Sequence, residues 1–225
     1  MKSILVTGGC GFIGSHTCLK LLRLDFNIII IDSNVNSTNI SIKKIIKIGH
    51  LDQKEFSDRI TFYKGDIRNR HLVEHIFDES MKKNNNIEAV IHFAGLKSVE
   101  KSVEDPLLYW ANNVWGSIVL FEVMQKFNCF NIVFSSSATV YSATNQVKLS
   151  EDSDLKPTNP YGETKLAIEK ILSGLFNGSH KKWKIINLRY FNPIGAHPSG
   201  LIGENPNSVP DNLFPYICMV AAGKL

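Results

Sequence analysis

Short runs of apolar, mostly β-branched residues alternate along the chain with longer stretches of helical periodicity. The apolar runs predict six strands, at residues 4–6, 27–31, 60–64, 89–93, 131–135 and 184–188. Helical patterns occupy residues 12–24, 40–48, 70–82, 105–127 and 161–176. Strands that alternate with helices are typical of a parallel sheet covered on both faces. The pattern therefore predicts an α/β fold built on a doubly wound parallel sheet.

The amino-acid composition of the chain changes after residue 190. Residues 192–211 carry four prolines and three glycines, which excludes a regular helix or strand. A last amphipathic helix is expected to begin near Pro210 and to be still running at Leu225. We expect residues 1–190 to form the nucleotide-binding domain and residues 191–225 to begin a smaller substrate lobe that is incomplete.

A glycine-rich turn directly follows the first predicted strand. Gly9, Gly11 and Gly14 satisfy G-x-G-x-x-G. Gly8, Gly11 and Gly14 also fit a variant of this motif in which the glycines are spaced by three residues. A strand, such a turn and a helix bring backbone N–H groups and a helix N-terminus against the pyrophosphate of a dinucleotide. A merely structural tight turn explains one of these glycines but not all three.

Two acidic residues follow strands in the same half of the chain. Asp32 closes the second predicted strand, where a carboxylate accepts hydrogen bonds from the adenosine ribose and repels a 2′-phosphate. This favours NAD over NADP, although a turn residue at the strand end is the alternative. Asp66 follows the third predicted strand and is placed to touch the adenine, with a helix N-cap as the alternative.

Tyr161 and Lys165 stand one helical turn apart, and a serine run at residues 135–137 ends the fifth predicted strand. A tyrosine beside a lysine is suited to moving a proton near a bound cofactor. The carboxyl ends of parallel strands border the ligand crevice of such a sheet. The dyad, the serines and the glycine turn together predict redox chemistry on a nicotinamide.

The composition of the chain argues against several other classes of protein. The 225 residues are 44% hydrophobic and 20% charged, and 25 basic residues exceed 21 acidic ones by four scattered charges. Neither nucleic acid nor a membrane is therefore an expected partner. The four cysteines show no metal-ligand spacing, so we expect reduced thiols and no metal site. No apolar run approaches the length of a membrane span, and we expect a cytoplasmic protein.

These motifs together resemble the extended short-chain dehydrogenase/reductase family, in its NAD-dependent epimerase/dehydratase branch. The resemblance covers essentially the whole chain and is carried by residues 6–17, 65–68, 90–97, 112–114, 135–141, 160–165 and 188–200. The block Leu-Arg-Tyr-Phe-Asn-Pro-x-Gly-Ala-His, which begins at Leu188, is far more specific than the glycine motif. The resemblance implies a Rossmann-like fold and reversible oxidation of a UDP-hexose at C4, which interconverts UDP-glucose and UDP-galactose in galactose metabolism.

The resemblance also implies roles for individual residues. Tyr161 would take the proton from the sugar 4-hydroxyl, Ser137 would relay it, and Lys165 would lower the pKa of Tyr161. Bringing a tyrosine pKa from about 10 to near 7 needs roughly 4 kcal/mol. A cation about 6 Å away supplies roughly 2.8 kcal/mol at an effective dielectric of 20. We therefore expect Lys165 and the positive nicotinamide of NAD+ to act together.

By the same resemblance, two sets of residues would line the ligands. The NAD set is Gly8, Gly11, Phe12, Ile13, Gly14, Asp32, Asn36, Asp66, Ile67, Phe93, Ala94, Gly95, Lys97, Asn112, Tyr161, Lys165 and Phe191. The nucleotide-sugar set is Lys97, Ser137, Tyr161, Asn192, Asn212 and Leu213. Relatives are commonly dimers, so a homodimer is a further expectation.

Three alternatives compete with this interpretation. A nucleotide-sugar 4,6-dehydratase needs an Asp-Glu acid/base pair after the fifth strand, where this chain has Ala138 and Thr139. A 4-epimerase of another UDP-hexose fits the same motifs. A NAD-binding protein with little or no turnover is the third, because the part of relatives that supplies most of the uridine lobe has no counterpart here.

Overall fold

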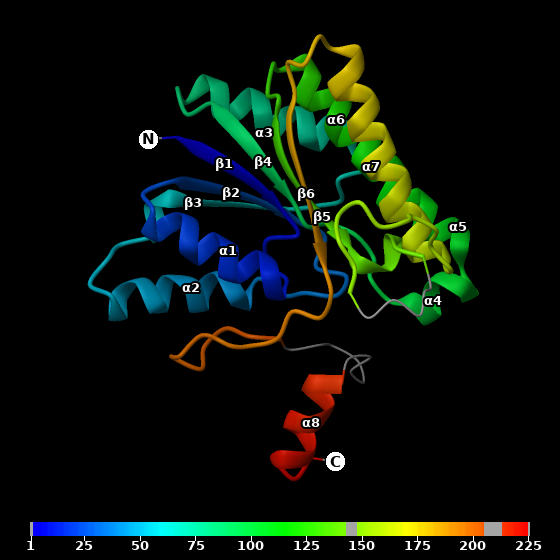
Figure 1. Ribbon diagram of the computed structural model, residues 1–225. Coiled ribbons are helices and arrows are strands. Elements are labelled where there is room, and N and C mark those ends of the chain that lie inside the picture. The colour runs from blue at the N-terminus through cyan, green and yellow to red at the C-terminus, as the bar shows by residue number, and fades with distance from the viewer. Residues whose placement is uncertain (1, 143–147, 205–212, 225) are drawn as a thin grey trace.

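A parallel sheet of six strands forms the centre of the molecule (Figure 1). The computed structural model describes residues 2–142, 148–204 and 213–224. The strand order is β3-β2-β1-β4-β5-β6, the doubly wound order in which two halves meet between β1 and β4. The strands are β1 (Ser3–Thr7), β2 (Asn27–Asp32), β3 (Ile60–Lys64), β4 (Ile87–His92), β5 (Asn131–Ser137) and β6 (Lys184–Tyr190). The predicted fold class and all six predicted strands are confirmed.

Helices cover both faces of this sheet (Figure 1). On one face lie α1 and α2, and on the other lie α3, α6 and α7. The helices are α1 (Phe12–Arg23), α2 (Ile40–Leu51), α3 (Arg70–Lys82), α4 (Val99–Glu104), α5 (Pro106–Tyr109), α6 (Gly116–Lys126), α7 (Pro160–Gly178) and α8 (Leu213–Ala221), with single turns η1 (Ser57–Arg59) and η3 (Ala138–Val140) and the π-helical η2 (Trp110–Trp115). Among the described helices, none combines the length and apolarity that crossing a bilayer requires.

Strand periodicity divides the core into two apolar layers. Ile4 and Val6 of β1 pack in one buried cluster with the helices α1 and α2, whereas Leu5 belongs to the opposite cluster with α3, α6 and α7. Successive strand side chains point to opposite faces, and here both faces are covered. This is why the first two strands are almost continuously apolar. The four cysteines are free thiols.

Two helical predictions differ from the structure. The helix predicted over residues 105–127 starts as expected, with Asp105 as the cap, but the wider π-helical turns of η2 separate α5 from α6. The last helix, α8, does not run to the end of the chain. It stops at Ala221, and Gly223 adopts a φ of 66°, a left-handed conformation that commonly ends helices.

His92 ties the end of β4 to its neighbours through hydrogen bonds. Ser117 Oγ donates its hydrogen to the Asn113 carbonyl, so it accepts from His92 Nε2 at 2.9 Å. His92 Nδ1 is then the acceptor for the Thr7 hydroxyl at 2.7 Å. This chain of donors requires a neutral imidazole. Burial, and next the positive charge of Lys165, lower the pKa of His92 to about 3.

The buried neutral histidine predicts a loss of stability in mild acid. The unfolded chain binds a proton at His92 near the ordinary histidine pKa of 6.5, but the folded protein does not until about pH 3. Stability is therefore intact above pH 6.5 and falls as the pH drops toward 3. Between pH 7 and pH 5 the loss is about 2 kcal/mol. Urea unfolding at both pH values measures it.

The matched control for this prediction is the exposed histidine His71. His92→Asn is expected to be less stable at pH 7 but to lose most of the acid sensitivity, whereas His71→Asn is expected to keep it. An unchanged pH slope in His92→Asn would show that another group controls acid stability.

Candidate functional site

The glycine turn packs the start of α1 tightly against the ends of β1 and β4. Gly8 has a φ of 68°, and a Cβ there would lie 2.8 Å from the Ala94 nitrogen. A Cβ on Gly14 would overlap the carbonyl oxygen of Gly8. Both positions therefore need glycine. A Cβ on Gly11 would meet only that same oxygen at 3.4 Å, so the turn is open on its outer side.

The N-terminus of α1 is free to receive an anion. Its N-cap residue, Gly11, provides no side-chain hydrogen bond, and the first turn holds no acidic residue. The N–H groups of such a turn carry the positive end of the helix dipole. A helix start without a side-chain cap, which a ligand can approach closely, is suited to binding a diphosphate.

Asp32 lies beside this turn and holds it in place. Its Oδ2 accepts from the Cys10 N–H at 2.9 Å, and its Oδ1 accepts from the Asn34 N–H and from Ser37 Oγ. The side chain is buried. A carboxylate oxygen can accept two hydrogen bonds, so Oδ2 retains room for a hydroxyl donor. Asn36, predicted in the same site, lies exposed in the loop that follows Asp32.

The residues after β3 have different surroundings from those predicted. Asp66 pairs with Arg68 and also accepts from the Arg68 N–H at 2.8 Å. The alternative that Asp66 caps a helix is wrong, because Asn69 caps α3 by accepting from the Leu72 N–H. Ile67 is buried in the core with α3 and α6, so backbone rather than side chain is its accessible part.

The loop after β4 is fixed by an asparagine that the sequence interpretation did not single out. Asn113 accepts from the Leu96 N–H at 2.8 Å and donates to the Leu96 carbonyl and to Thr164 Oγ1. Asn113 is buried on η2, whose wider turns are often found at functional sites. The neighbouring Asn112, which was predicted to bind the cofactor, donates to the Leu108 carbonyl. Phe93, Ala94 and Gly95 follow β4 directly, between β1 and this asparagine.

Strand β5 and helix α7 bring the predicted proton-transfer group together. Ser137 is the last residue of β5, and Asn159 caps α7 one position before Pro160, by accepting from the Gly162 N–H. The Ser137 hydroxyl accepts from Thr139 and also hydrogen-bonds the Tyr161 side chain. The serine run is a strand end and not a polar turn. Tyr161 and Ser137 are thus neighbours, as the sequence predicts.

Lys165 is a buried ammonium directly beneath Tyr161. Its Nζ donates to the Ser135 carbonyl at 2.8 Å and lies 4.9 Å from the ring centroid of Phe134 and 5.8 Å from that of Tyr161. Burial lowers the pKa of Lys165 to about 8. The ammonium is therefore close to Tyr161, but it lies over the aromatic ring.

In the protein alone the pKa of Tyr161 lies above its ordinary value, and the fall expected from Lys165 and NAD+ together stays a prediction. Burial raises this pKa, and the hydrogen bond with Ser137 only partly opposes the rise. In the protein alone Lys165 does not oppose the rise, because its pKa of about 8 lies below that of Tyr161 and the lysine has lost its proton by the pH at which this phenol ionises. Tyr161 therefore keeps its proton at neutral pH until a further positive charge arrives.

A buried ion pair supports the serine strand from behind. Arg189 on β6 donates to both carboxylate oxygens of Glu169 on α7, at 3.1 and 2.8 Å. The same carboxylate accepts from the Ser136 hydroxyl, and Arg189 also donates to the Tyr141 hydroxyl at 3.1 Å. This network fixes α7 relative to β5. It therefore fixes Tyr161 relative to Ser137.

The segment after β6 reaches back to α1. A cavity of about 290 Å³ lies between Phe12, Ile13 and His16 of α1 and residues 193–196. Phe191 and Asn192, which begin this segment, are exposed. A larger hollow of about 680 Å³ lies at the opposite ends of β5 and β6, beside Trp183, and away from the dyad. The smaller cavity is the one that adjoins the predicted cofactor residues.

Three predicted site residues remain: Lys97, Leu213 and Asn212. Lys97 lies at the site and its Nζ pairs with Glu204 Oε1 at 3.3 Å. Leu213 is 77% exposed on α8, which buries none of its residues, so it does not join the others. The other large apolar side chains of α8, Phe214, Tyr216, Ile217 and Val220, are exposed as well. Asn212 lies outside the described residues.

Comparison with known proteins agrees with the motifs. The sequence model described as GDP-mannose 4,6 dehydratase matches residues 5–225. UDP-glucose 4-epimerase 2 of Arabidopsis thaliana is 49% identical over 223 residues, which cover 99% of this chain and 61% of that protein. A UDP-glucose 4-epimerase of Neisseria meningitidis serogroup C is 51% identical over 228 residues and is covered to 63%. The chain thus spans less than two thirds of these relatives.

Solved structures agree with the same assignment. A UDP-glucose 4-epimerase from Bifidobacterium longum, in complex with NAD+ and UDP, superposes with a TM-score of 0.89 at 42% identity. The match covers 100% of this chain and 63% of that one. The resemblance drawn from the motifs is confirmed. The chain belongs to the GDP-mannose 4,6 dehydratase family, the epimerase/dehydratase branch of the extended short-chain dehydrogenase/reductases.

Proposed function

We propose that this chain is the NAD-binding and proton-transferring part of a UDP-hexose 4-epimerase that interconverts UDP-glucose and UDP-galactose. The observation that carries the proposal is the meeting of Ser137, Tyr161 and Lys165 at the carboxyl end of β5, with α7 anchored behind them. The relatives named UDP-glucose 4-epimerase support the same reaction.

The glycine turn and its neighbours would hold NAD. The uncapped start of α1, with Gly8, Gly11, Phe12, Ile13 and Gly14, would receive the diphosphate. Asp32 would accept from the adenosine ribose through the free capacity of Oδ2. When bound, NAD supplies a reversible hydride acceptor whose oxidised ring is positively charged. A structure with NAD+ is known for the Bifidobacterium longum enzyme.

The remaining named residues would complete the two sites. Asn36, Asp66, Ile67, Phe93, Ala94, Gly95, Lys97, Asn112 and Phe191 are proposed to line NAD, and Lys97, Asn192, Asn212 and Leu213 to meet the nucleotide sugar. For Ile67 the contact is assigned to the backbone because its side chain is buried.

Tyr161 would act as the base that removes the proton from the sugar 4-hydroxyl. Its hydroxyl hydrogen-bonds Ser137, which can pass the proton between Tyr161 and the sugar oxygen. Burial makes the phenolate costly, so a cation is required beside it. Lys165 provides one buried positive charge below the ring. The base is therefore weak by itself and becomes stronger when a second positive charge is bound.

The dehydratase reaction named by the family model is disfavoured here. Elimination of water across C5 and C6 needs a carboxylic acid and a base after Ser137. This chain has Ala138 and Thr139 there, and both Thr139 N–H and Oγ1 donate to Ser137. These groups support Ser137 and cannot perform an elimination.

We also infer that the chain forms a homodimer. Val103, Leu107 and Trp115 lie on the consecutive helical segments α4, α5 and η2, and their exposed fractions are 63%, 79% and 52%. Exposed apolar side chains gathered on neighbouring helices favour contact with a second copy.

The direct test mixes the purified protein with UDP-galactose, without added NAD, and follows UDP-glucose. Formation of UDP-glucose supports the proposal. A 4-keto-6-deoxy product would move the assignment to dehydration. Tight NAD binding without turnover would leave a NAD-binding protein and contradict the epimerase assignment for this chain.

Replacement of Tyr161 by phenylalanine tests the base. Tyr161→Phe removes the ionisable oxygen and keeps the ring that packs over Lys165, so NAD binding is expected to be retained. Epimerisation is expected to fall at least about a hundredfold, the usual contribution of a positioned acid or base. Retained turnover in this variant would exclude Tyr161 as the base.

Lys165→Met is expected to stabilise the fold while it weakens NAD binding. The charged ammonium is buried, and its pKa is lowered from 10.5 to about 8, so below pH 8 the folded protein bears the cost of that charge. Removing it is expected to raise the free energy of unfolding by up to about 3 kcal/mol at pH 7, the free energy that corresponds to the lowered pKa. The gain should shrink as the pH rises from 8 toward 10.5. Urea unfolding measures it, with the exposed Lys170→Met on the same helix as control.

A further inference from the structure

Tyr161 lies in the first turn of α7, where backbone N–H groups have no acceptor within the helix. Asn159 is the cap residue of this helix, Pro160 has no N–H, and Tyr161 follows directly. The first amides of a helix must be satisfied by side chains or by water. The acceptor of the Tyr161 N–H therefore helps to decide how firmly the proposed base is held.

A serine from another helix accepts the hydrogen bond of the Tyr161 amide. The Tyr161 N–H donates to Ser102 Oγ at 3.2 Å, although the two residues lie 59 positions apart. The neighbouring Gly162 N–H donates instead to Asn159 Oδ1 at 2.8 Å, which is a local cap. The Tyr161 amide thus depends on α4, whereas the Gly162 amide depends on the helix's own cap residue.

The hydroxyl of Ser102 is oriented to accept this hydrogen bond. It donates its own hydrogen to the Val99 carbonyl at 2.6 Å, in the same short helix. A hydroxyl has one hydrogen and two acceptor lone pairs, so Oγ can still accept from Tyr161. Ser102 is 0% exposed. An acceptor lost at this position is therefore not replaced by bulk water.

Helix α4 is short, but both of its ends are capped. Ser98 Oγ accepts from the Lys101 N–H, and the Ser98 carbonyl accepts from the Ser102 N–H at 3.2 Å. Asp105 ends α4 and caps α5 by accepting from the Leu108 N–H at 3.0 Å. A helix that is fixed at both ends can hold a residue of another helix in place.

Other contacts hold the start of α7 from different sides. A Cβ on Gly162 would lie 2.6 Å from the Thr139 carbonyl oxygen, so the helix start packs directly on η3. The Tyr161 carbonyl accepts from Thr164 Oγ1 at 2.7 Å, and Thr164 Oγ1 accepts in turn from Asn113. The backbone of Tyr161 is thus held at its carbonyl through η2 and at its N–H by α4.

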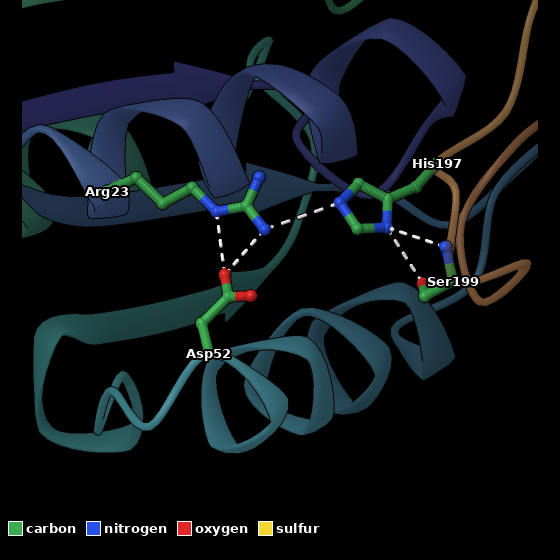
Figure 2. Close-up of polar contacts among 4 residues, drawn as sticks. All are labelled: Arg23, Asp52, His197 and Ser199. Carbon is green, nitrogen blue, oxygen red and sulfur yellow. Dashed lines mark hydrogen bonds and ion pairs between the residues drawn. The ribbon is translucent and has the colours of Figure 1, made fainter.

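Polar contacts at the surface of the fold differ from this hydrogen bond in their exposure. In the cluster of Figure 2, Arg23 of α1 donates through Nε to Asp52 Oδ2 at 2.8 Å, and the two side chains are 34% and 33% exposed. Water can replace either partner there, so such a contact contributes little free energy. Loss of the buried Ser102 hydroxyl instead leaves a backbone donor without its acceptor.

We propose that Ser102 is a positioning residue for the base: by accepting from the Tyr161 N–H, it fixes the start of α7 so that the phenol reaches Ser137. The hydrogen bond between the Tyr161 side chain and Ser137 requires the Tyr161 backbone to stay in one place. Ser102 contacts no reacting atom and acts only through Tyr161. Its role in the reaction rests on the proposed function, whereas its hold on the Tyr161 amide does not.

Hydrogen exchange of the Tyr161 amide tests this hydrogen bond directly. Ser102→Ala removes the acceptor and is expected to reduce the protection of that amide about fivefold, the effect of one hydrogen bond. The Gly162 amide is the internal reference, because Asn159 still accepts from it. Unchanged protection at Tyr161, or an equal loss at both amides, would overturn the proposal.

Two further variants separate loss of this acceptor from loss of a buried hydroxyl in general. Ser80→Ala removes another buried hydroxyl, which donates to the Asn85 carbonyl after α3, and is expected to leave the Tyr161 amide unchanged. Ser102→Thr keeps a hydroxyl and is expected to restore most of the protection. An equal loss in Ser80→Ala, or the same loss in Ser102→Thr as in Ser102→Ala, would contradict the assignment.

Turnover is the measurement that a merely structural hydrogen bond would not change. With UDP-galactose as substrate, Ser102→Ala is expected to lower kcat about tenfold and to change KM less than about twofold, because a misplaced base slows the chemical step. Ser80→Ala is expected to keep the wild-type kcat. A wild-type kcat in Ser102→Ala, together with faster exchange of the Tyr161 amide, would refute the positioning role.

The two measurements distinguish failure of this inference from failure of the proposed function. If the wild type forms no UDP-glucose, the proposed function fails, and with it any role of Ser102 in the reaction. Exchange of the Tyr161 amide still decides whether Ser102 holds the start of α7.

Discussion

The buried ammonium of Lys165 is the constraint on which the site depends. The structure removes this charge from water and offers it a carbonyl oxygen and two aromatic rings. Among the described ion pairs, none includes Lys165, so desolvation is not offset by an opposite charge. A fold tolerates such a cost only where the charge has another use. The position of the ammonium 5.8 Å from the Tyr161 ring centroid supports our proposal that its use is to stabilise negative charge on the phenol oxygen.

The rest of the fold supplies the geometry around this charge. Gly8 and Gly14 let α1 approach the sheet so closely that its N-terminus borders the same edge as β4 and β5. Asn113 connects the loop after β4 to α7, and Glu169 with Arg189 connects α7 to β5 and β6. Each connection joins elements that are far apart in sequence. A dinucleotide and a proton-transfer group can therefore occupy one crevice.

Much of this could be predicted from the sequence because its signals are local. A β-branched run followed by a glycine turn and a helix leaves few alternatives, and the strands were predicted within a few residues. Tyr161 and Lys165 are spaced by one helical turn, so a helix alone makes them neighbours. Asp32 followed from its fixed place at the end of β2.

What could not be predicted depends on contacts between distant segments. The pKa of Tyr161 rises because of burial, which spacing alone does not reveal. Asn113 gains its role from the π-helical turns of η2, and no residue pattern in a predicted helix marks such turns. Ser102 meets the Tyr161 amide across 59 positions of sequence. The end of α8 was missed because its apolar pattern continues past Ala221, whereas the backbone turns at Gly223.

The ionisation of Tyr161 with different cofactors tests the central claim most directly. Absorbance of the phenolate is titrated against pH with NAD+, with NADH and without cofactor, and the Tyr161→Phe signal is subtracted to remove the five other tyrosines of the six in the chain. The account predicts a pKa above the ordinary value of about 10 without cofactor, a clear fall with NAD+, and a smaller change with NADH. An equal pKa with NAD+ and NADH would contradict it.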